Sequence, residues 1–231
     1  MLTGISLQAV LFDMDGTLVD TEQHWDVALE ELAESLGGSL SAEARAAITG
    51  SSVPTALGIL YADVGVDRDA AQQADDDRWL QDRVTELMRT SVPWRPGAPE
   101  LLQAVRDTDL RTALVTTTFR AIADIALQHI GVDFFDVTVC GDEVPATKPD
   151  PAPYLQAMRA LGVDPATCVV IEDSVTGVAA GLAAGAAVLG VPSLSPLDPS
   201  PRLTVRDGLV GLTIEDLTEL VTDRAGARAA G

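Results

Sequence analysis

The sequence predicts an α/β fold in which helices cover both faces of a parallel sheet. Short apolar runs alternate with helical segments over most of the 231 residues, and this alternation is typical of parallel sheets. A block without a convincing strand, from about residue 20 to residue 91, interrupts the pattern after the first strand. We therefore predict an α/β core at residues 1–19 and 92–223, a helical domain inserted at residues 20–91, and a disordered tail at residues 224–231.

The first half of the chain contains one expected strand, followed only by helices. Residues 7–12 form a short continuous apolar run, which is typical of a buried strand. A helix is expected over residues 21–36, because apolar residues recur there at helical spacing and Gly37 and Gly38 then end it. Ser41 is expected to cap a short helix. Further helices are expected over residues 54–64 and 69–88, and the acidic stretch 69–77 is expected to face solvent.

The second half alternates between expected helices and strands. Pro93, Pro96 and Pro99 mark the change of organisation. Helices are expected over residues 98–106, 119–130, 150–161, 175–184 and 215–223. Strands are expected over residues 111–115, 137–140, 168–171, 186–189 and 209–212.

Side chains that carry chemistry stand just after several of these strands. Asp13 and Asp15 follow the first strand, and Thr116 and Asp173 each follow directly on a later one. Lys148 follows the strand at residues 137–140 after a loop. Because ligands of open parallel sheets bind at the carboxyl ends of the strands, we expect these side chains to converge on one edge. The spacing and the topology thus predict a functional site.

The lysine usage singles out one position. Of 15 basic residues, Lys148 is the single lysine and the other 14 are arginines. Lysine is a compact point charge, whereas arginine is a wide planar fork, so the two are not interchangeable at a tight site. A lysine retained in an otherwise arginine-using chain indicates a position that arginine does not fill.

The side chains expected at this edge suit magnesium and phosphate. Asp13 and Asp173, with backbone oxygens near Asp15, offer the hard oxygen ligands that Mg²⁺ prefers, and nothing there offers the ligands of a zinc site. Thr116 and the N–H groups after it can bond phosphate oxygens, and Lys148 adds a fixed positive charge. Asp13 can act as a nucleophile, and Asp15 is close enough in sequence to serve as general acid and base.

Residues 10–22, VLFDMDGTLVDTE, resemble the first motif, DxDGTLxDT, of the haloacid dehalogenase-like hydrolase superfamily. Three later stretches resemble its other motifs in the right order: Thr116 with Thr117, Lys148 with Pro149, and residues 171–174 with Gly177. The resemblance covers the chain from about residue 10 to residue 191. It implies a Rossmann-like core, a helical cap domain inserted after the first strand, and Mg²⁺ as the cofactor.

The resemblance also implies a role for each matching residue. Asp13 would be the nucleophile and a metal ligand, and Asp15 the general acid and base as well as a backbone metal ligand. Phosphate would be bound by Thr116, Thr117 and Lys148, and the metal also by Asp173, with Glu172 as a further ligand or a residue just behind the ligands.

Within the superfamily, the helical insert resembles the cap of the β-phosphoglucomutase and phosphoglycolate phosphatase-like branch. We expect a magnesium-dependent phosphatase, a phosphoric monoester hydrolase, that acts on a small phosphorylated metabolite such as a sugar phosphate through an aspartyl-phosphate intermediate. A phosphosugar mutase is the first alternative. It is disfavoured because the lysine and arginine of the mutase cap correspond here to Thr49, before Gly50, and to Val53, so a second phosphate would lose its cationic partners.

Two further expectations concern residues outside these motifs, and one concerns the function. His24 could face either the site or solvent, and Arg120 is expected on the surface at a helix start rather than at the phosphate. A non-catalytic ligand-binding relic of the fold is the second alternative for function. The sequence speaks against it, because it keeps Asp13, Asp15, Lys148 and Asp173 intact.

The composition limits the partners. A formal net charge of −20 argues against nucleic acid and anionic membranes, which need a basic surface. Cys140 and Cys168 lie in apolar runs and are expected to be buried free thiols in a reducing cytoplasm. No segment resembles a signal peptide or a membrane span. A cytoplasmic monomer that binds a small-molecule phosphate ester is expected.

Overall fold

The computed structural model describes residues 6–48, 51, 53–200 and 202–229. The chain divides into two compact units. Residues 1–20 and 93–231 belong to one, called here the core unit, and residues 21–92 to the other, called the helical unit. Thr49 and Gly50, on which the comparison with the mutase cap depends, lie outside the described residues.

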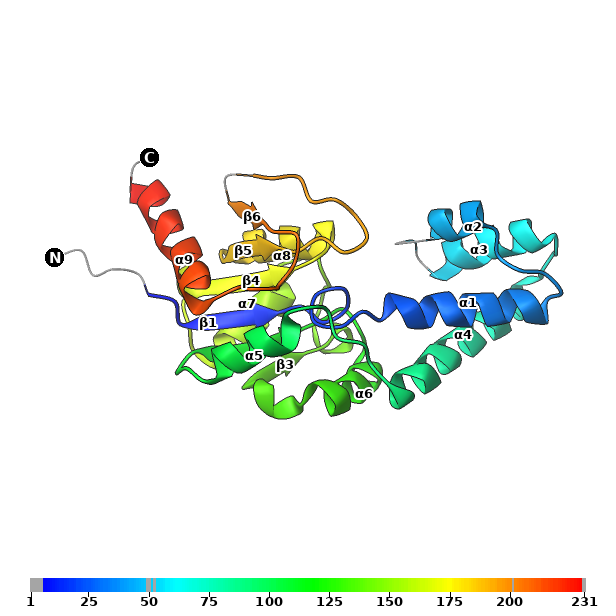
Figure 1. The fold of residues 1–231 in the computed structure, drawn as a ribbon, viewed down its shortest axis with the longest axis horizontal. Coiled ribbons are helices and arrows are strands. Elements are labelled where there is room, and N and C mark those ends of the chain that lie inside the picture. The colour runs from blue at the N-terminus through cyan, green and yellow to red at the C-terminus, as the bar shows by residue number, and fades with distance from the viewer. Residues whose placement is uncertain (1–5, 49–50, 52, 201, 230–231) are drawn as a thin grey trace. The chain divides into compact units, whose positions relative to one another are not determined.

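A parallel sheet of six strands forms the centre of the core unit (Figure 1). The strand order is β3-β2-β1-β4-β5-β6, so β1 lies between β2 and β4. This sheet confirms the predicted α/β fold. The strands are β1 (Ala9–Phe12), β2 (Arg111–Val115), β3 (Val137–Val139), β4 (Cys168–Glu172), β5 (Ala187–Gly190) and β6 (Leu203–Val205).

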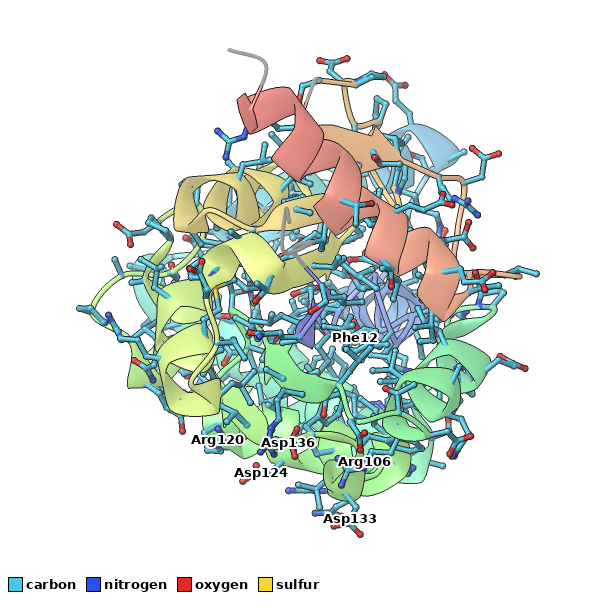
Figure 2. All side chains as sticks on the ribbon, turned by 90° about the vertical axis from the view of Figure 1, so that its left-hand side faces the viewer. Phe12, Arg106, Arg120, Asp124, Asp133 and Asp136 are labelled. Carbon is cyan, nitrogen blue, oxygen red and sulfur yellow. The ribbon has the colours of Figure 1, made fainter. Side chains whose placement is uncertain are left out.

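Helices cover both faces of this sheet (Figures 1 and 2). α7 (Ala152–Leu161) and α8 (Val175–Ala184) pack on one face, and α5 (Ala98–Arg106) and α9 (Ile214–Ala229) lie on the other. α6 (Arg120–Ile130) follows β2. Ala9 and Leu11 of β1 join the core under α7 and α8, and Val10 and Phe12 are equally buried. Because side chains alternate along a strand, an apolar run without polar residues indicates burial on both faces.

Two features near the C-terminus differ from the sequence expectation. The strand expected at residues 209–212 is wrong, because that segment is a turn and the last strand is β6. Gly211 has a φ of +73°, and the Leu212 N–H donates to the Leu209 carbonyl oxygen at 3.1 Å. Both leucines are buried, so the apolar pattern comes from a turn that packs them into the core. α9 also continues to Ala229, where a disordered tail from residue 224 was expected. Alanine, which is frequent there, has the highest helix propensity.

Both cysteines lie inside the core unit. Cys140 and Cys168 are free and buried, which confirms the expectation that they are small apolar side chains rather than a disulfide. Burial raises the pKa of the Cys140 thiol to about 11 and that of Cys168 to about 12. Neither is therefore a reactive thiolate near neutral pH.

The helical unit consists of four helices in its described part. They are α1 (Glu22–Ser35), α2 (Ala42–Ile48), α3 (Val53–Val64) and α4 (Ala70–Thr90). Ser41 Oγ accepts the Ala44 N–H at 3.1 Å, which is the cap expected for α2. Asp69 caps α4 in a capping box with Gln72. Over the described residues, no helix is both long enough and apolar enough to cross a bilayer.

One aspartate of the acidic stretch 69–77 is buried, although the whole stretch was expected to face solvent. Asp76 lies on α4 and is 6% exposed. Arg68 reaches it with two hydrogen bonds, Nε to Oδ2 at 2.8 Å and Nη2 to Oδ1 at 2.6 Å. Tyr61 of α3 donates to Oδ2 at 2.9 Å. A buried carboxylate is retained here because three donors satisfy it.

Asp76→Ala is therefore expected to destabilise the helical unit by about 2 kcal/mol, the cost of losing hydrogen bonds to a charged group. Urea unfolding followed by far-ultraviolet circular dichroism measures this loss. The control is Asp75→Ala in the same helix, because Asp75 pairs with Arg78 and both side chains are largely exposed. Equal unfolding midpoints for the two variants would contradict the structural role of Asp76.

Candidate active site

The carboxyl ends of β1, β2 and β4 bring together the predicted site residues of the core unit. The Asp13 N–H donates to the Ile171 carbonyl at 3.0 Å, and the Thr116 N–H donates to the Val139 carbonyl at 3.0 Å. These bonds extend the sheet ladder one residue beyond each strand, so the polar side chains start from a fixed backbone. Asp13, Thr116 and Asp173 are all buried.

Lys148 connects the three strand ends. Its Nζ lies 2.6 Å from Asp13 Oδ1, 2.6 Å from Glu172 Oε1 and 2.8 Å from the Val115 carbonyl oxygen. An ammonium group has three N–H donors, and these three oxygens match them. The lysine that the composition singled out is thus buried among acids from β1 and β4.

Glu172 is a fully buried carboxylate whose two oxygens both accept hydrogen bonds. Oε1 accepts the Tyr154 hydroxyl at 2.7 Å beside the contact with Lys148. Oε2 accepts the Asp173 N–H at 3.2 Å and the Ser174 hydroxyl at 3.1 Å. A Cβ on Gly177 would lie 1.9 Å from the Glu172 carboxyl group, so the glycine of this motif leaves room for the acid.

Asp173 is held from the other side by the loop after β5. Ser193 Oγ donates to Asp173 Oδ2. Gly16 lies against the same oxygen, since a Cβ there would come within 2.1 Å of it, and Gly16 also has a φ of +78°. Only glycine satisfies both the backbone angle and the close approach. The turn after β1 and the loop after β5 therefore fix the position of this carboxylate.

The carboxylates of Asp13, Glu172 and Asp173 crowd one place. One ligand oxygen from each lies within 4.8 Å of the others. Burial raises the pKa of Asp13 well above its ordinary value despite the opposing charge of Lys148, and burial raises the pKa of Asp173 to about 6. Burial acts to lower the pKa of Lys148, but the charges of Asp13 and Glu172 outweigh it and raise that pKa, so the ammonium stays charged.

This cluster fits a divalent cation. Three carboxylates (−3) and one ammonium (+1) carry a formal net charge of −2 when all are ionised. A buried charge imbalance of this size is costly unless a counter-charge is present. The donors are all hard carboxylate oxygens, which suit Mg²⁺ and not the softer metals.

Asp15 is not one of the three carboxylates of this cluster, and two threonines donate hydrogen bonds to it. Thr118 Oγ1 donates to Asp15 Oδ2 at 2.7 Å, and Thr116 Oγ1 donates to the same oxygen at 3.3 Å. Thr117 has an exposed side chain. The loops after β2 and β3 meet closely there, because a Cβ on Gly141 would lie 2.1 Å from the Thr117 carbonyl oxygen.

Sequence reasoning missed three residues that contact this site. They are Thr118, Tyr154 and Ser193. Ser193 follows β5 closely, so the rule used for Asp13 and Asp173 could have found it. Thr118 stands in the same run of threonines as Thr116. Tyr154 carries no sequence signal, because a tyrosine in a helix is normally a packing residue.

Two residues with open expectations lie elsewhere. Arg120 Nη1 lies 3.2 Å from Asp124 Oδ1, and Nη2 lies 2.8 Å from Glu143 Oε2. Figure 2 labels Arg120 and Asp124. Arg120 lies at the start of a helix, as the sequence indicated, and the structure pairs it there with two acids. His24 is buried within the helical unit, and its Nε2 lies 2.7 Å from the Ser91 carbonyl oxygen. It does not face solvent.

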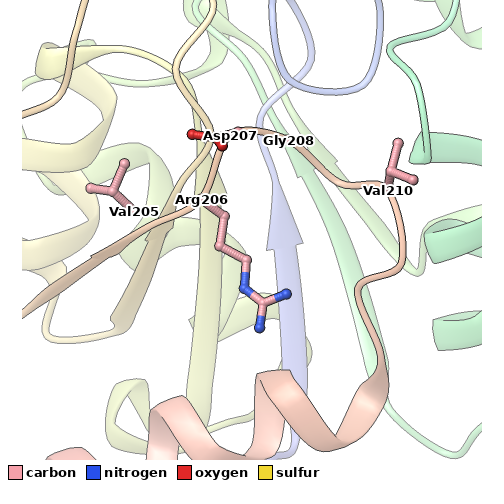
Figure 3. A pocket seen from close by; sticks show the side chains of 5 residues that line it. All are labelled: Val205, Arg206, Asp207, Gly208 and Val210. Atoms are coloured by element: carbon pink, nitrogen blue, oxygen red, sulfur yellow. The ribbon is translucent and has the colours of Figure 1, made fainter.

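A hollow of about 550 Å³ lies at the end of β6, lined by Val205, Arg206, Asp207, Gly208 and Val210 (Figure 3). Arg206 points from it toward α9 and pairs with Asp216 at 2.8 Å. The guanidinium is thus engaged. None of the predicted site residues lines this hollow, so the carboxylate cluster remains the candidate active site.

Added Mg²⁺ is expected to raise the melting temperature more at about pH 7.5 than at about pH 5, because protons compete with the metal for its carboxylates. Burial raises the pKa of Asp173 to about 6 from an ordinary 3.8. Between about pH 4 and pH 6, Asp173 therefore binds more protons in the folded metal-free protein than in the unfolded chain. The contribution of Asp173 to the free energy of unfolding therefore falls as the pH rises from about 4 to about 6. Thermal scans with and without Mg²⁺ measure the difference, and Asp173→Asn is expected to abolish it. An equal gain at both pH values would place the metal elsewhere.

Ser193→Ala is expected to weaken Mg²⁺ binding by about tenfold, because partners that orient a metal ligand contribute on that scale. Isothermal titration calorimetry with Mg²⁺ measures the affinity directly. Ser195→Ala is the matched control, since Ser195 is exposed in the same loop. Unchanged affinity in Ser193→Ala would show that the Asp173 carboxylate needs no support from this loop.

Comparisons with known proteins agree with this geometry. The family model for haloacid dehalogenase-like hydrolases matches residues 7–185. Hexitol phosphatase B of Escherichia coli O157:H7 is 31% identical over 228 residues, which are 95% of this chain and 97% of that protein. The phosphorylated carbohydrates phosphatase of Thermotoga maritima is 34% identical over 184 residues, which are 78% of this chain and 82% of that protein.

A solved structure shows the same fold. The crystal structure of CbbY from Rhodobacter sphaeroides in complex with phosphate has a TM-score of 0.73 and 27% sequence identity, and covers 91% of this chain and 99% of that one. The phosphatase relatives and the family model confirm the enzyme class predicted from the sequence, a phosphoric monoester hydrolase. The chain belongs to the haloacid dehalogenase-like hydrolase family.

Proposed function

We propose that this enzyme is a magnesium-dependent phosphatase that hydrolyses a small sugar phosphate or a similar metabolite through a phosphoaspartate on Asp13. The observation that carries the proposal is the buried cluster in which Lys148 lies 2.6 Å from Asp13, beside the carboxylate of Asp173. The names of the relatives, a hexitol phosphatase and a phosphorylated carbohydrates phosphatase, support a sugar phosphate as the substrate class.

Asp13 and Asp15 divide the chemistry between them. In the first step a carboxylate oxygen of Asp13 attacks the phosphorus, the bond from phosphorus to the ester oxygen breaks, and Asp15 gives its proton to the leaving oxygen. In the second step water attacks the phosphorus of the acyl phosphate and Asp15 takes a proton from that water. Asp13 is regenerated as a carboxylate and inorganic phosphate leaves.

Lys148, Thr116 and Thr117 are the proposed phosphate-binding residues. The ammonium of Lys148 lies against Asp13 Oδ1, so its charge stands next to the place where the phosphoryl group becomes attached. Its three donors already have acceptors. Lys148 therefore acts on the phosphate by charge, or by exchanging one of these bonds, and it orients Asp13 in the meantime.

Asp13, Asp173 and a backbone oxygen at Asp15 are the proposed metal ligands. Glu172 is placed behind them, because both of its oxygens already accept hydrogen bonds and Lys148 shares one of them. When bound, Mg²⁺ supplies positive charge that offsets the repulsion between these carboxylates and an incoming phosphate.

The helical unit is proposed to act as a cap that selects the substrate. It supplies none of the carboxylates of the cluster. Its residues can therefore be adapted to the leaving group of the substrate without changing those carboxylates. A cap that closes over the site excludes water and favours small molecules over proteins. The chemistry and the selection of substrate would thus reside in separate units.

Phosphate release from a panel of small phosphate esters tests the proposal, with Mg²⁺ and with a chelator. We expect release that depends on Mg²⁺ and that Asp13→Asn lowers by at least about a thousandfold, because the nucleophile is lost. Asp133→Asn is the matched control, since Asp133 is an exposed aspartate remote from the cluster. Activity retained by Asp13→Asn would exclude the phosphoaspartate route.

The same experiment separates the two alternatives. Interconversion of β-glucose 1-phosphate and glucose 6-phosphate with a bisphosphate primer, without net hydrolysis, would indicate the mutase. Neither reaction from a folded protein that binds Mg²⁺ would indicate the ligand-binding relic of the fold.

A further inference from the structure

Asp15 is anchored by Thr118, which is not among the motif residues named in the sequence analysis. Thr118 Oγ1 donates to Asp15 Oδ2 at 2.7 Å, the shorter of the two threonine contacts to that oxygen. The two residues are 103 positions apart in the sequence. Their contact exists because β1 and β2 are neighbours in the sheet, so the loops that follow them run side by side.

The two threonines differ in what they can offer Asp15 once substrate is present. A hydroxyl group has one proton to donate. Thr116 Oγ1 already accepts the Thr118 N–H at 3.0 Å, and its proton points to Asp15 over the longer distance of 3.3 Å. A phosphate oxygen is a strong hydrogen-bond acceptor, and the Thr116 hydroxyl would donate to it instead of to Asp15. Thr118 is then the threonine that still holds Asp15.

The hydroxyl of Thr118 is not needed to start the following helix. α6 begins at Arg120, its N-cap residue is Phe119, and the Arg120 N–H donates to Asp142 Oδ1 at 2.9 Å. Threonine is common before helices because it caps them, but that explanation does not apply here. The half-buried hydroxyl instead reaches across to the loop after β1.

We propose that Thr118 is a positioning residue whose hydroxyl anchors Oδ2 of Asp15 through both proton transfers. The inference rests on the proposed function, in which Asp15 protonates the leaving oxygen and later deprotonates water. No bond to Thr118 forms or breaks: the proton that Asp15 gives in the first step leaves with the product alcohol, and a proton from the attacking water replaces it on Asp15 in the second. A hydroxyl suits this task because it can donate to a carboxylate and accept from a protonated carboxyl group.

The test compares Thr118→Val, which removes the hydroxyl at constant shape, with Thr118→Ser, which keeps it. For the best ester of the panel, we expect Thr118→Val to lower kcat by about tenfold to a hundredfold with KM changed less than about twofold, because proton transfer is impaired and ground-state binding is not. Thr118→Ser is expected to recover kcat to within about threefold. Thr204→Val, at an exposed position of β6, is the matched control and should behave as the wild type.

Two kinetic outcomes would overturn the inference. A raised KM at unchanged kcat would make Thr118 a phosphate-binding residue, and unchanged kinetics would show that Asp15 needs no anchor. A variant is folded if its melting temperature equals that of the wild type. Its metal site is intact if added Mg²⁺ raises that temperature by the same amount as in the wild type. If Thr118→Val does not fold, Thr118→Ala takes its place in the same comparison.

Crystal structures of the wild type and Thr118→Val provide a readout that does not depend on activity. A rotated Asp15 carboxyl group in the variant supports the anchor, and an unmoved one overturns it. If the wild type releases phosphate from no ester while the variant shows a rotated Asp15, the proposed function fails and the anchoring contact stands. The two failures are therefore distinguishable.

Discussion

Three buried carboxylates share one buried ammonium at the carboxyl edge of the sheet, and the organisation of the core unit depends on this imbalance. Carboxylates with so little access to water are costly unless they are paired or hydrogen-bonded. Glu172 is satisfied by Lys148, Tyr154 and backbone N–H groups. The excess negative charge that remains is carried by Asp13 and Asp173, and burial raises the pKa values of both carboxyl groups. These two acids are the ones proposed to hold a cation, so the electrostatic cost of the fold and the chemistry of the site have one origin.

The space around the cluster is as specific as its charge. Gly16 and Gly177 stand where a Cβ would overlap the carboxyl groups of Asp173 and Glu172. Their absence of a side chain lets the turn after β1 and the start of α8 approach the acids. Ser193 and Thr118 then fix the orientation of single carboxylate oxygens. The acids of the site are therefore held by loops from several strands, which is how a rigid sheet positions mobile side chains.

The buried polar group of the helical unit differs in its charge balance from the cluster of the core unit. This group, Asp76 with Arg68 and Tyr61, has complete hydrogen-bonding partners and no excess of negative charge. Such a cluster favours one packing arrangement of α3 and α4 and offers little to a ligand. The polar cluster of the helical unit has complete hydrogen bonding, and we assign it a structural role. The carboxylate cluster of the core unit carries excess negative charge, and we assign it a chemical role.

The sequence by itself determined the α/β fold, most element bounds and the strand-end positions of Asp13, Thr116 and Asp173. Periodicity and turn residues carry that information locally, and a parallel sheet converts strand ends into one edge. Prediction from the sequence failed where an apolar or acidic pattern had another cause. Residues 209–212 form a turn that buries two leucines. Asp76 is buried because it has partners outside its own helix.

Only the tertiary structure decided which atoms meet. The contact of Thr118 with Asp15 spans 103 positions and that of Tyr154 with Glu172 spans 18. Neither leaves a periodic signal, because a hydroxyl at a loop or on a helix has many local uses. The bond that Lys148 makes to Asp13 Oδ1 likewise depends on the register of neighbouring strands. Local sequence encodes where a strand ends, and the packing of strands determines which side chains then share a charge.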